Sequence, residues 1–267
     1  MAGEQSESSA QGTEDDKEDF GMAVFEGTAL RLKHLSLEEM DALVGQPSPL
    51  VGAFRIRLAR SEEARRDAGA LVERRYATRG YDIPELQGDP HLFTFLAFDE
   101  GRLVGTVSIR LDSDAGMSAD ALYRVEIDQL RSNGHRLCEF TRLAVDVSAA
   151  SKPVLAALFH TAYLFAYRLR GISAAIIEVN PRHVVFYQRA LAFNIVGEER
   201  MNERVNAPAI LMRVYFEDIS EGLEKFAGQP SLANATRTLF PYGFPPKDAE
   251  GILARMREAL GTGASQD

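Results

Sequence analysis

The chain has 267 residues, of which 45% are hydrophobic, so it is ordinary for a globular protein and long enough for one large domain or two small ones. Its net charge is −9, and residues 1–20 carry −6 of it, so the rest of the chain is only mildly acidic. An acidic N-terminus is the reverse of a signal peptide, a single cysteine excludes an internal disulfide, and the longest apolar run, 154–167, is too short to span a membrane. We therefore expect a cytoplasmic protein with no transmembrane segment and no nucleic-acid partner.

Two segments precede the body of the protein. Residues 1–20 are rich in Glu, Asp, Ser and Gly, and we expect them to be disordered. Residues 21–52 are expected to form a short helix and a connector, because they contain a capping box followed by a glycine and two prolines. The body then covers 53–218, and a C-terminal helical extension covers 219–267.

Alternation of apolar and polar residues predicts the strands of the body, and capping residues predict its helices. The expected strands are 54–58, 92–98, 102–111, 136–146, 174–179, 193–196 and 209–216, and the expected helices are 61–79, 151–171 and one that begins at Asn180. The stretch 112–133 is interpreted as a polar insertion. This order of elements indicates an α+β (mixed α/β) fold with helices flanking a twisted, mostly antiparallel central sheet.

An arginine-rich segment opens the body. Eight arginines lie between residues 55 and 79, against four acidic residues. This local positive charge has two interpretations, a solvated helix face or a surface that attracts an acidic partner.

The C-terminal extension contains two contrasting stretches. Residues 239–246 hold three prolines, and we expect no regular structure there. Further along, four apolar residues share one helical face: Ile252, Leu253, Met256 and Leu260. This stripe could dock on the body or on another protein, and the oligomeric state stays open.

Glu139 is the candidate general base of the chain. Transfer of an acyl group from a thioester to an amine needs a base for the ammonium, donors for the oxyanion and a proton for the leaving thiolate. Glu139 lies on an apolar strand, where burial would raise its pKa toward the working pH. The alternative is a structural ion pair with Arg142.

A β-bulge between Glu139 and Arg142 is predicted on geometric grounds. Strict alternation would place these two side chains on opposite faces of the strand. A bulge would change this, and bulges are common beside active sites. It would also leave backbone N–H groups able to bind a thioester oxygen or a pantetheine arm.

Tyr187 and His183 are candidates on the helix that begins at Asn180. Tyr187 could protonate a leaving thiolate or could be an ordinary core residue. For His183 we expect an orienting or structural role, because the positive end of the helix dipole lowers a histidine pKa. The other histidines show no metal-ligand spacing, so we expect no metal.

Several motifs together resemble those of known acyltransferases. The strand 139–145 resembles the Glu-x-x-Arg strand of acyl-homoserine-lactone autoinducer synthases, and Arg110 matches a further arginine of that family. Segments 73–76 and 80–84 resemble the arginine-bearing helix and the loop of those synthases. Segments 179–183 and 206–211 look more like the N-acyl amino acid synthases, which are their relatives in the GCN5-related N-acyltransferase (GNAT) superfamily. The resemblance covers about residues 50–216.

This resemblance implies a GNAT-like N-acyltransferase. The donor would be a long-chain acyl-phosphopantetheine thioester on acyl carrier protein, the acceptor the amine of an amino acid, and no cofactor would be tightly bound. Glu139 would be the base, Arg142 would position the strand or the substrate, and Tyr187 would assist the leaving thiol. The donor would lie against Leu143, Ala144, Val145 and Asn180, and the residues contacting substrate or carrier would be Arg74, Arg75, Arg110 and His183.

The chain also departs from its relatives. Coenzyme A-dependent enzymes carry a glycine-rich loop that binds pyrophosphate, whereas residues 147–153 contain no glycine. Weak coenzyme A binding is therefore expected. Ala192 stands where the superfamily usually has glycine, and the chain lacks the tryptophan common in autoinducer synthases, so S-adenosylmethionine is not expected as acceptor. The alternatives are a coenzyme A-dependent N-acetyltransferase and a non-catalytic acyl-binding or partner-binding module.

Overall fold

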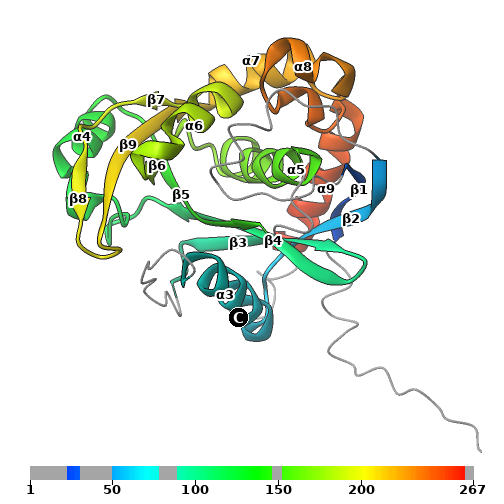
Figure 1. Ribbon diagram of the computed structural model, residues 1–267, viewed down its shortest axis with the longest axis horizontal. Coiled ribbons are helices and arrows are strands. Elements are labelled where there is room, and N and C mark those ends of the chain that lie inside the picture. The colour runs from blue at the N-terminus through cyan, green and yellow to red at the C-terminus, as the bar shows by residue number, and fades with distance from the viewer. Residues whose placement is uncertain (1–22, 31–49, 78–88, 146–151, 262–267) are drawn as a thin grey trace, which may run out of the picture.

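A computed structural model describes residues 23–30, 50–77, 89–145 and 152–261. Within them, one twisted sheet has the strand order β1-β2-β3-β4-β5-β6-β9-β7, and the short β8 pairs with β9 off this path. Among the described strands, β5 and β6 pair in parallel and all other pairings are antiparallel. The α+β class predicted from the sequence, with helices flanking a mostly antiparallel sheet, is confirmed (Figure 1).

The strands are β1 (Ala23–Leu30), β2 (Leu50–Leu58), β3 (Leu92–Asp99), β4 (Arg102–Leu111), β5 (Leu137–Val145), β6 (Ala174–Val179), β7 (Asn194–Ile195), β8 (Arg200–Asn202) and β9 (Ala207–Tyr215). The α-helices are α3 (Glu62–Ala77), α4 (Asp120–Ser132), α5 (Lys152–Tyr163), α6 (Val184–Leu191), α7 (Phe216–Phe226), α8 (Ala233–Thr236) and α9 (Pro246–Gly261). The short 3-10 and π-helical segments are η1 (Leu164–Leu169), η2 (Pro181–His183), η3 (Pro230–Leu232) and η4 (Phe240–Tyr242).

The two faces of the sheet are covered by different helices. On one face α5 packs in the main core with Val107, Ile109 and Phe140, and Lys152 to Tyr163 of this helix are almost entirely buried, as its all-round apolar sequence predicts. On the other face lie α3 and α4, with α3 on the opposite side of β3 and β4 from α5 in Figure 1. Cross-strand neighbours in the register therefore share either the α5 face or the α3–α4 face.

Helix α4 corrects the interpretation of 112–133 as a polar insertion. Its buried residues are Tyr123, Ile127 and Leu130, which follow the spacing of one helical face. They pack against Ile176 and Leu211 of the sheet. The Tyr123 hydroxyl donates to the carbonyl of Ala209 at 2.6 Å, which ties α4 to β9. The many charges around this stripe masked a helix that tertiary packing stabilises.

The segment 21–52 also differs from its prediction, because β1 adds a strand to the edge of the sheet, antiparallel to β2. The short helix expected there, the acidic tail 1–20 and the loop 80–84 lie outside the described residues. In 239–246, where no regular structure was expected, η4 forms one 3-10 turn. Within the described ranges, no helix has the length and apolar character needed to cross a membrane.

The C-terminal extension packs on the body. Ile252, Leu253 and Met256 of α9 are at most 3% exposed, so docking of the predicted apolar stripe on the body is confirmed. His160 of α5 helps to fix the extension, because its Nδ1 accepts a hydrogen bond from the Phe244 backbone N–H at 2.9 Å and the two rings stack at 4.7 Å. Burial lowers the pKa of His160 to about 3, so this acceptor stays neutral at physiological pH.

Candidate functional site

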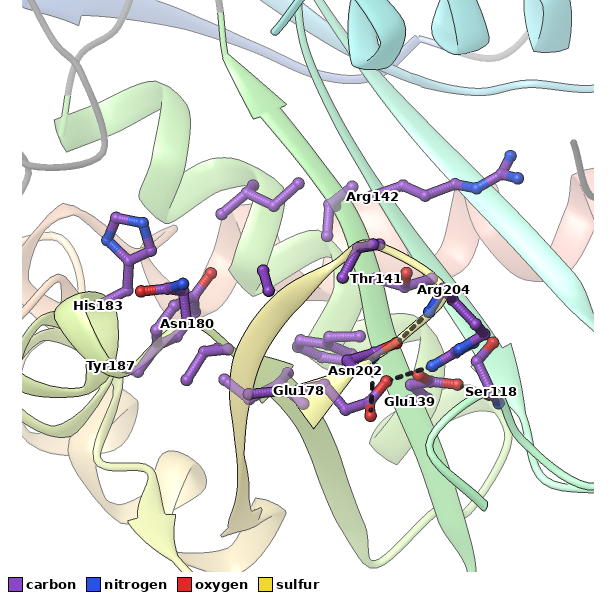
Figure 2. A pocket seen from close by; sticks show the side chains of 18 of the residues that line it. Ser118, Glu139, Thr141, Arg142, Glu178, Asn180, His183, Tyr187, Asn202 and Arg204 are labelled. Atoms are coloured by element: carbon purple, nitrogen blue, oxygen red, sulfur yellow. Dashed lines mark hydrogen bonds and ion pairs between the residues drawn. The ribbon is translucent and has the colours of Figure 1, made fainter. Parts of the chain in front are cut away.

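A cleft opens where β5 and β6 stop pairing. The two strands pair in parallel only from Leu137 to Glu139 on β5 and from Ala174 to Ile176 on β6, although β5 continues to Val145. A pocket of about 220 Å³ lies at this divergence. Figure 2 shows its polar side chains, and its lining includes Ser118, Glu139, Thr141, Arg142, Leu143, Glu178, Asn180, His183, Tyr187, Asn202 and Arg204.

A β-bulge is present in β5, but it begins at Arg142 and not between Glu139 and Arg142 as predicted, because Glu139 to Thr141 pair regularly with β4. Ser108 pairs with Thr141 and Thr106 pairs with Ala144, so β5 advances three residues while β4 advances two. The extra residue falls at Arg142–Leu143, and Arg142 has a φ of +52°. Such a backbone conformation is costly for a residue with a side chain, and it is typical of functional sites.

The bulge turns Arg142 toward the α3–α4 face, on which Glu139 lies. Arg142 lines a second cavity of about 350 Å³ beneath α3, together with Thr94 and Ser108. Ser108 is two residues from Arg110, the register partner of Glu139, so these side chains share one face. In Figure 2 the Arg142 side chain nevertheless points away from Glu139. The geometry therefore favours a role for Arg142 in shaping the bulge over a structural pair with Glu139.

Glu139 has the electrostatic environment of a general base. It is 3% exposed, and its Oε2 accepts a hydrogen bond from the Ser118 backbone N–H at 2.7 Å. Burial raises the pKa of Glu139 to about 7, and the nearby Glu178 carboxylate adds to the rise, while the Ser118 N–H and Arg204 oppose it. A carboxylate with a pKa close to neutrality can both take and release a proton at physiological pH.

A second group of polar residues in the pocket was missed in the sequence. Arg204 forms an ion pair with Glu178, with 2.6 Å between Nη2 and Oε2, and the Asn202 amide donates to the other Glu178 oxygen at 3.4 Å. Glu178 could have been noticed, because it is a lone carboxylate in an otherwise apolar strand. Asn202 ends β8 and Arg204 lies in the polar turn before β9, and neither carries such a signal.

The other wall of the pocket comes from the turn between β6 and α6. Asn180 caps η2 as predicted, because its side chain accepts a hydrogen bond from the Arg182 backbone N–H at 3.3 Å. Tyr187 is 8% exposed and packs edge-on against Phe186 and Phe193, so it lines the pocket and also belongs to the core. The Nε2 of His183 accepts a hydrogen bond from the Arg182 Nε–H at 3.1 Å, a contact that fits the orienting or structural role expected for it.

Several predicted site residues lie outside this pocket. Ala144 packs against α3 and Val145 belongs to the core beneath α5, so of the expected donor contacts only Leu143 and Asn180 line the pocket. Arg110 forms an ion pair with Asp89 at 3.0 Å and donates to the Ser118 hydroxyl at 3.1 Å, so it supports the loop that binds Glu139.

Arg74 is exposed on α3 and does not line the pocket, and the Arg75 side chain lies outside the described part of the structure. Residues 147–151 of the glycine-free segment are also not described. In the described ranges no group of three or more His, Cys, Asp or Glu residues is arranged to hold a metal ion.

Comparisons with known proteins agree with this geometry. The family model of the N-acyl amino acid synthase FeeM matches residues 67–215. The solved structure of FeeM, from uncultured soil microbes, is 29% identical to this chain, with a TM-score of 0.58 over 63% of this chain and 94% of FeeM.

Two further structures show weaker similarity. The acyl-homoserine-lactone synthase LasI is 15% identical with a TM-score of 0.41, over 62% of this chain and 91% of its own. A putative N-acetyltransferase from Lactobacillus plantarum is 15% identical with a TM-score of 0.45, over 61% of this chain and 98% of its own. A search of curated proteins found no significant match.

The family assignment depends on the FeeM match alone. That match covers more than half of the chain, and it contains Glu139, the bulge, Tyr187 and the β8–β9 hairpin. The FeeM structure has a similar fold, with a TM-score of 0.58. The chain therefore belongs to the N-acyl amino acid synthase family and is an N-acyltransferase.

Proposed function

We propose that this protein transfers a long-chain acyl group from the phosphopantetheine thioester of acyl carrier protein to the α-amino group of an amino acid. One observation carries the proposal. The carboxylate of Glu139, with a pKa near 7, lies at the open end of the diverging β5–β6 pair and beside the β5 bulge. A base, two diverging strands and an adjoining pocket are parts that aminolysis of a thioester can use.

In the proposed reaction Glu139 takes a proton from the bound ammonium group, directly or through a water molecule. The amine nitrogen then attacks the thioester carbon, forming the C–N bond, and the oxyanion is stabilised by backbone N–H groups at the bulge. Collapse of this intermediate breaks the C–S bond. The thiolate receives a proton from the Tyr187 hydroxyl, whose position on the pocket wall supports this role. The second proton of the attacking nitrogen passes through water to the tyrosinate, and Glu139 releases its own proton to solvent, so the products are a neutral amide and a thiol.

The divergence of the two strands favours a pantetheine arm in the cleft. The described register pairs β5 with β6 only as far as Glu139, so the arm could enter between the two strands and pair along a strand edge. The pocket wall also contains Phe140, Leu143, Phe159 and Ile177, which suit an acyl chain.

The choice of donor can be tested by presenting one acyl chain in two forms. Purified protein is supplied with the same long-chain acyl group on acyl carrier protein or on coenzyme A, together with a panel of amino acids, and amide products are measured by mass spectrometry. We expect a higher kcat/KM with the carrier-protein thioester. A higher kcat/KM with the coenzyme A thioester would contradict the donor assignment and favour the coenzyme A-dependent alternative.

Charge reversal on α3 should weaken use of the carrier protein. Arg66 and Arg74 are exposed on this helix, and acyl carrier proteins are acidic. Loss of two favourable charge contacts and gain of two repulsive ones should raise the KM for acyl carrier protein about tenfold when both residues are changed to Glu. An acyl-pantetheine donor, which lacks the carrier protein, should react at the wild-type rate.

The matched control for this pair is Arg124→Glu on α4, since Arg124 is also exposed. An equal rise in KM in the double variant and in Arg124→Glu, or no rise in the double variant, would show that α3 does not contact the carrier.

A further inference from the structure

A second carboxylate lies beside Glu139 in the pocket. Glu178 is two residues beyond Ile176, the register partner of Glu139, so both glutamates project from neighbouring strands onto the same face. The two lie close enough for the Glu178 carboxylate to raise the pKa of Glu139. Arg204 is the cation next to them, and its ion pair with Glu178 is shown in Figure 2.

We propose that Arg204 binds the α-carboxylate of the acceptor amino acid, and that Glu178 holds the Arg204 guanidinium in position for it. This inference depends on the proposed N-acyltransfer to an amino acid. The acceptor carries its ammonium and carboxylate groups on one carbon atom, so a carboxylate-binding group must lie close to the base. Arg204 meets this condition because it lines the same pocket as Glu139 and lies close enough to affect its ionisation.

The guanidinium has capacity for a substrate. An arginine side chain carries five N–H donors. Among the described residues, the Arg204 guanidinium makes one hydrogen bond, from Nη2 to Glu178 at 2.6 Å. The Arg204 side chain is 37% exposed whereas that of Glu178 is 11% exposed, so the other donors can be reached from solvent. A planar guanidinium can therefore keep its internal partner along one edge and bind a second carboxylate along another.

Asn202 positions both members of this pair. Its Oδ1 accepts a hydrogen bond from the Arg204 backbone N–H at 3.0 Å, while its Nδ2 donates to Glu178 at 3.4 Å. Asn202 is itself 6% exposed, at the end of β8, where it pairs with Ala207 across the hairpin. The arginine is thus fixed at its backbone and at its guanidinium, which lowers the entropy lost when a substrate binds.

This arrangement predicts discrimination between amino acids and simple amines. An amino acid would place its ammonium group at the glutamates and its carboxylate on Arg204. The corresponding decarboxylated amine would satisfy only the first contact. When the amine and the amino acid carry the same side chain, a difference between their rates comes from the carboxylate alone.

The test compares two matched pairs, leucine with 3-methylbutylamine and tyrosine with tyramine, using one acyl-carrier-protein donor. In the wild-type protein we expect a higher kcat/KM for the amino acid of each reactive pair. In Arg204→Gln this preference should fall about 10- to 100-fold, the scale of one charge-assisted hydrogen-bonded contact. The KM for the acyl donor should not change, and Arg204→Lys should restore part of the preference.

Arg124→Gln, an exposed arginine on α4, is the matched control and should retain the wild-type preference. If the wild-type protein acylates both members of a pair equally, or if Arg204→Gln keeps the full preference, the assignment of Arg204 is wrong while the acyltransferase function stands. If no amino acid is acylated from any thioester, the proposed function itself fails and this inference fails with it.

Glu178 provides an independent readout. Its negative charge raises the pKa of Glu139, whereas Arg204 lowers it. The other charged residue beside Glu139 is Arg110, its register partner on β4. In Glu178→Gln the acid limb of the kcat profile should therefore move to lower pH. If kcat falls but the acid limb stays at the wild-type pH, Glu178 has only a structural role and the role proposed for it here is wrong.

Discussion

Replacement of Glu139 by Gln should lower kcat at least about 100-fold and up to roughly 10,000-fold, the range for loss of a general base. Glutamine has the same shape, and its amide oxygen can still accept the Ser118 N–H bond that fixes the Glu139 carboxylate. It cannot accept a proton from the ammonium group. The KM for the acyl donor should change little, because the donor contacts in this account are made by the backbone of β5.

The same variant should be at least as stable as the wild-type protein at pH 8. Burial raises the folded-state pKa of Glu139 from its usual 4.5 to about 7, so folding favours the protonated form. The ionised carboxylate therefore lowers the free energy of unfolding progressively as the pH rises from 4.5 to 7, and the loss is complete above pH 7. An uncharged glutamine removes this cost. Urea denaturation at pH 8 measures it.

Glu221→Gln, on an exposed position of α7, is the control for both measurements. It should retain wild-type activity and stability. An unchanged rate in Glu139→Gln would remove Glu139 from the mechanism. A lost rate with a large loss of stability would show that the residue acts through the fold.

Replacement of Phe216 by Ala should lower the free energy of unfolding by about 3–5 kcal/mol. Phe216 is fully buried at the junction of β9 and α7, and its ring lies 6.1 Å from Phe140, 5.8 Å from Tyr163 and 5.9 Å from Tyr167. Its removal would leave a cavity where the C-terminal extension meets the core. The expected fall in the midpoint of thermal unfolding is roughly 6–20 °C.

Val185→Ala is the matched control, because Val185 is 41% exposed on α6 and its truncation should cost little. Both variants are measured by urea denaturation with the wild-type protein. A loss below about 1 kcal/mol in Phe216→Ala would be far less than burial of an aromatic ring predicts. It would show that the extension is not part of the same cooperative unit as the acyltransferase core.

Much of the sheet could be predicted because its patterns are local. Alternation located β3, β4, β5 and β6 to within a few residues, and the apolar sequence of α5 predicted its burial. The edge strand β1 was missed, since its pairing with β2 joins distant segments. Helix α4 was missed because its apolar face is narrow and many charged residues flank that face.

The site could be predicted only in part for the same reason. Glu139 and the bulge could be predicted from the sequence of one strand. Strict alternation would place Glu139 and Arg142 on opposite faces of this strand, and a bulge removes that conflict. Glu178 and Arg204 come together through the pairing of β6 with β9, and the β8–β9 hairpin then carries Arg204 to the pocket. No short-range pattern links positions that are 26 residues apart.

The pH dependence of kcat tests the central claim, that Glu139 is the base, most directly. It is measured with saturating acyl carrier protein thioester and the amino acid that reacts fastest, in the wild-type protein and in Glu139→Gln. The account predicts that the wild-type kcat rises with pH through a pKa of about 7, as Glu139 becomes able to accept a proton, and that this rise is absent in Glu139→Gln. An acid limb near 4.5, or a limb near 7 that persists in Glu139→Gln, would contradict it.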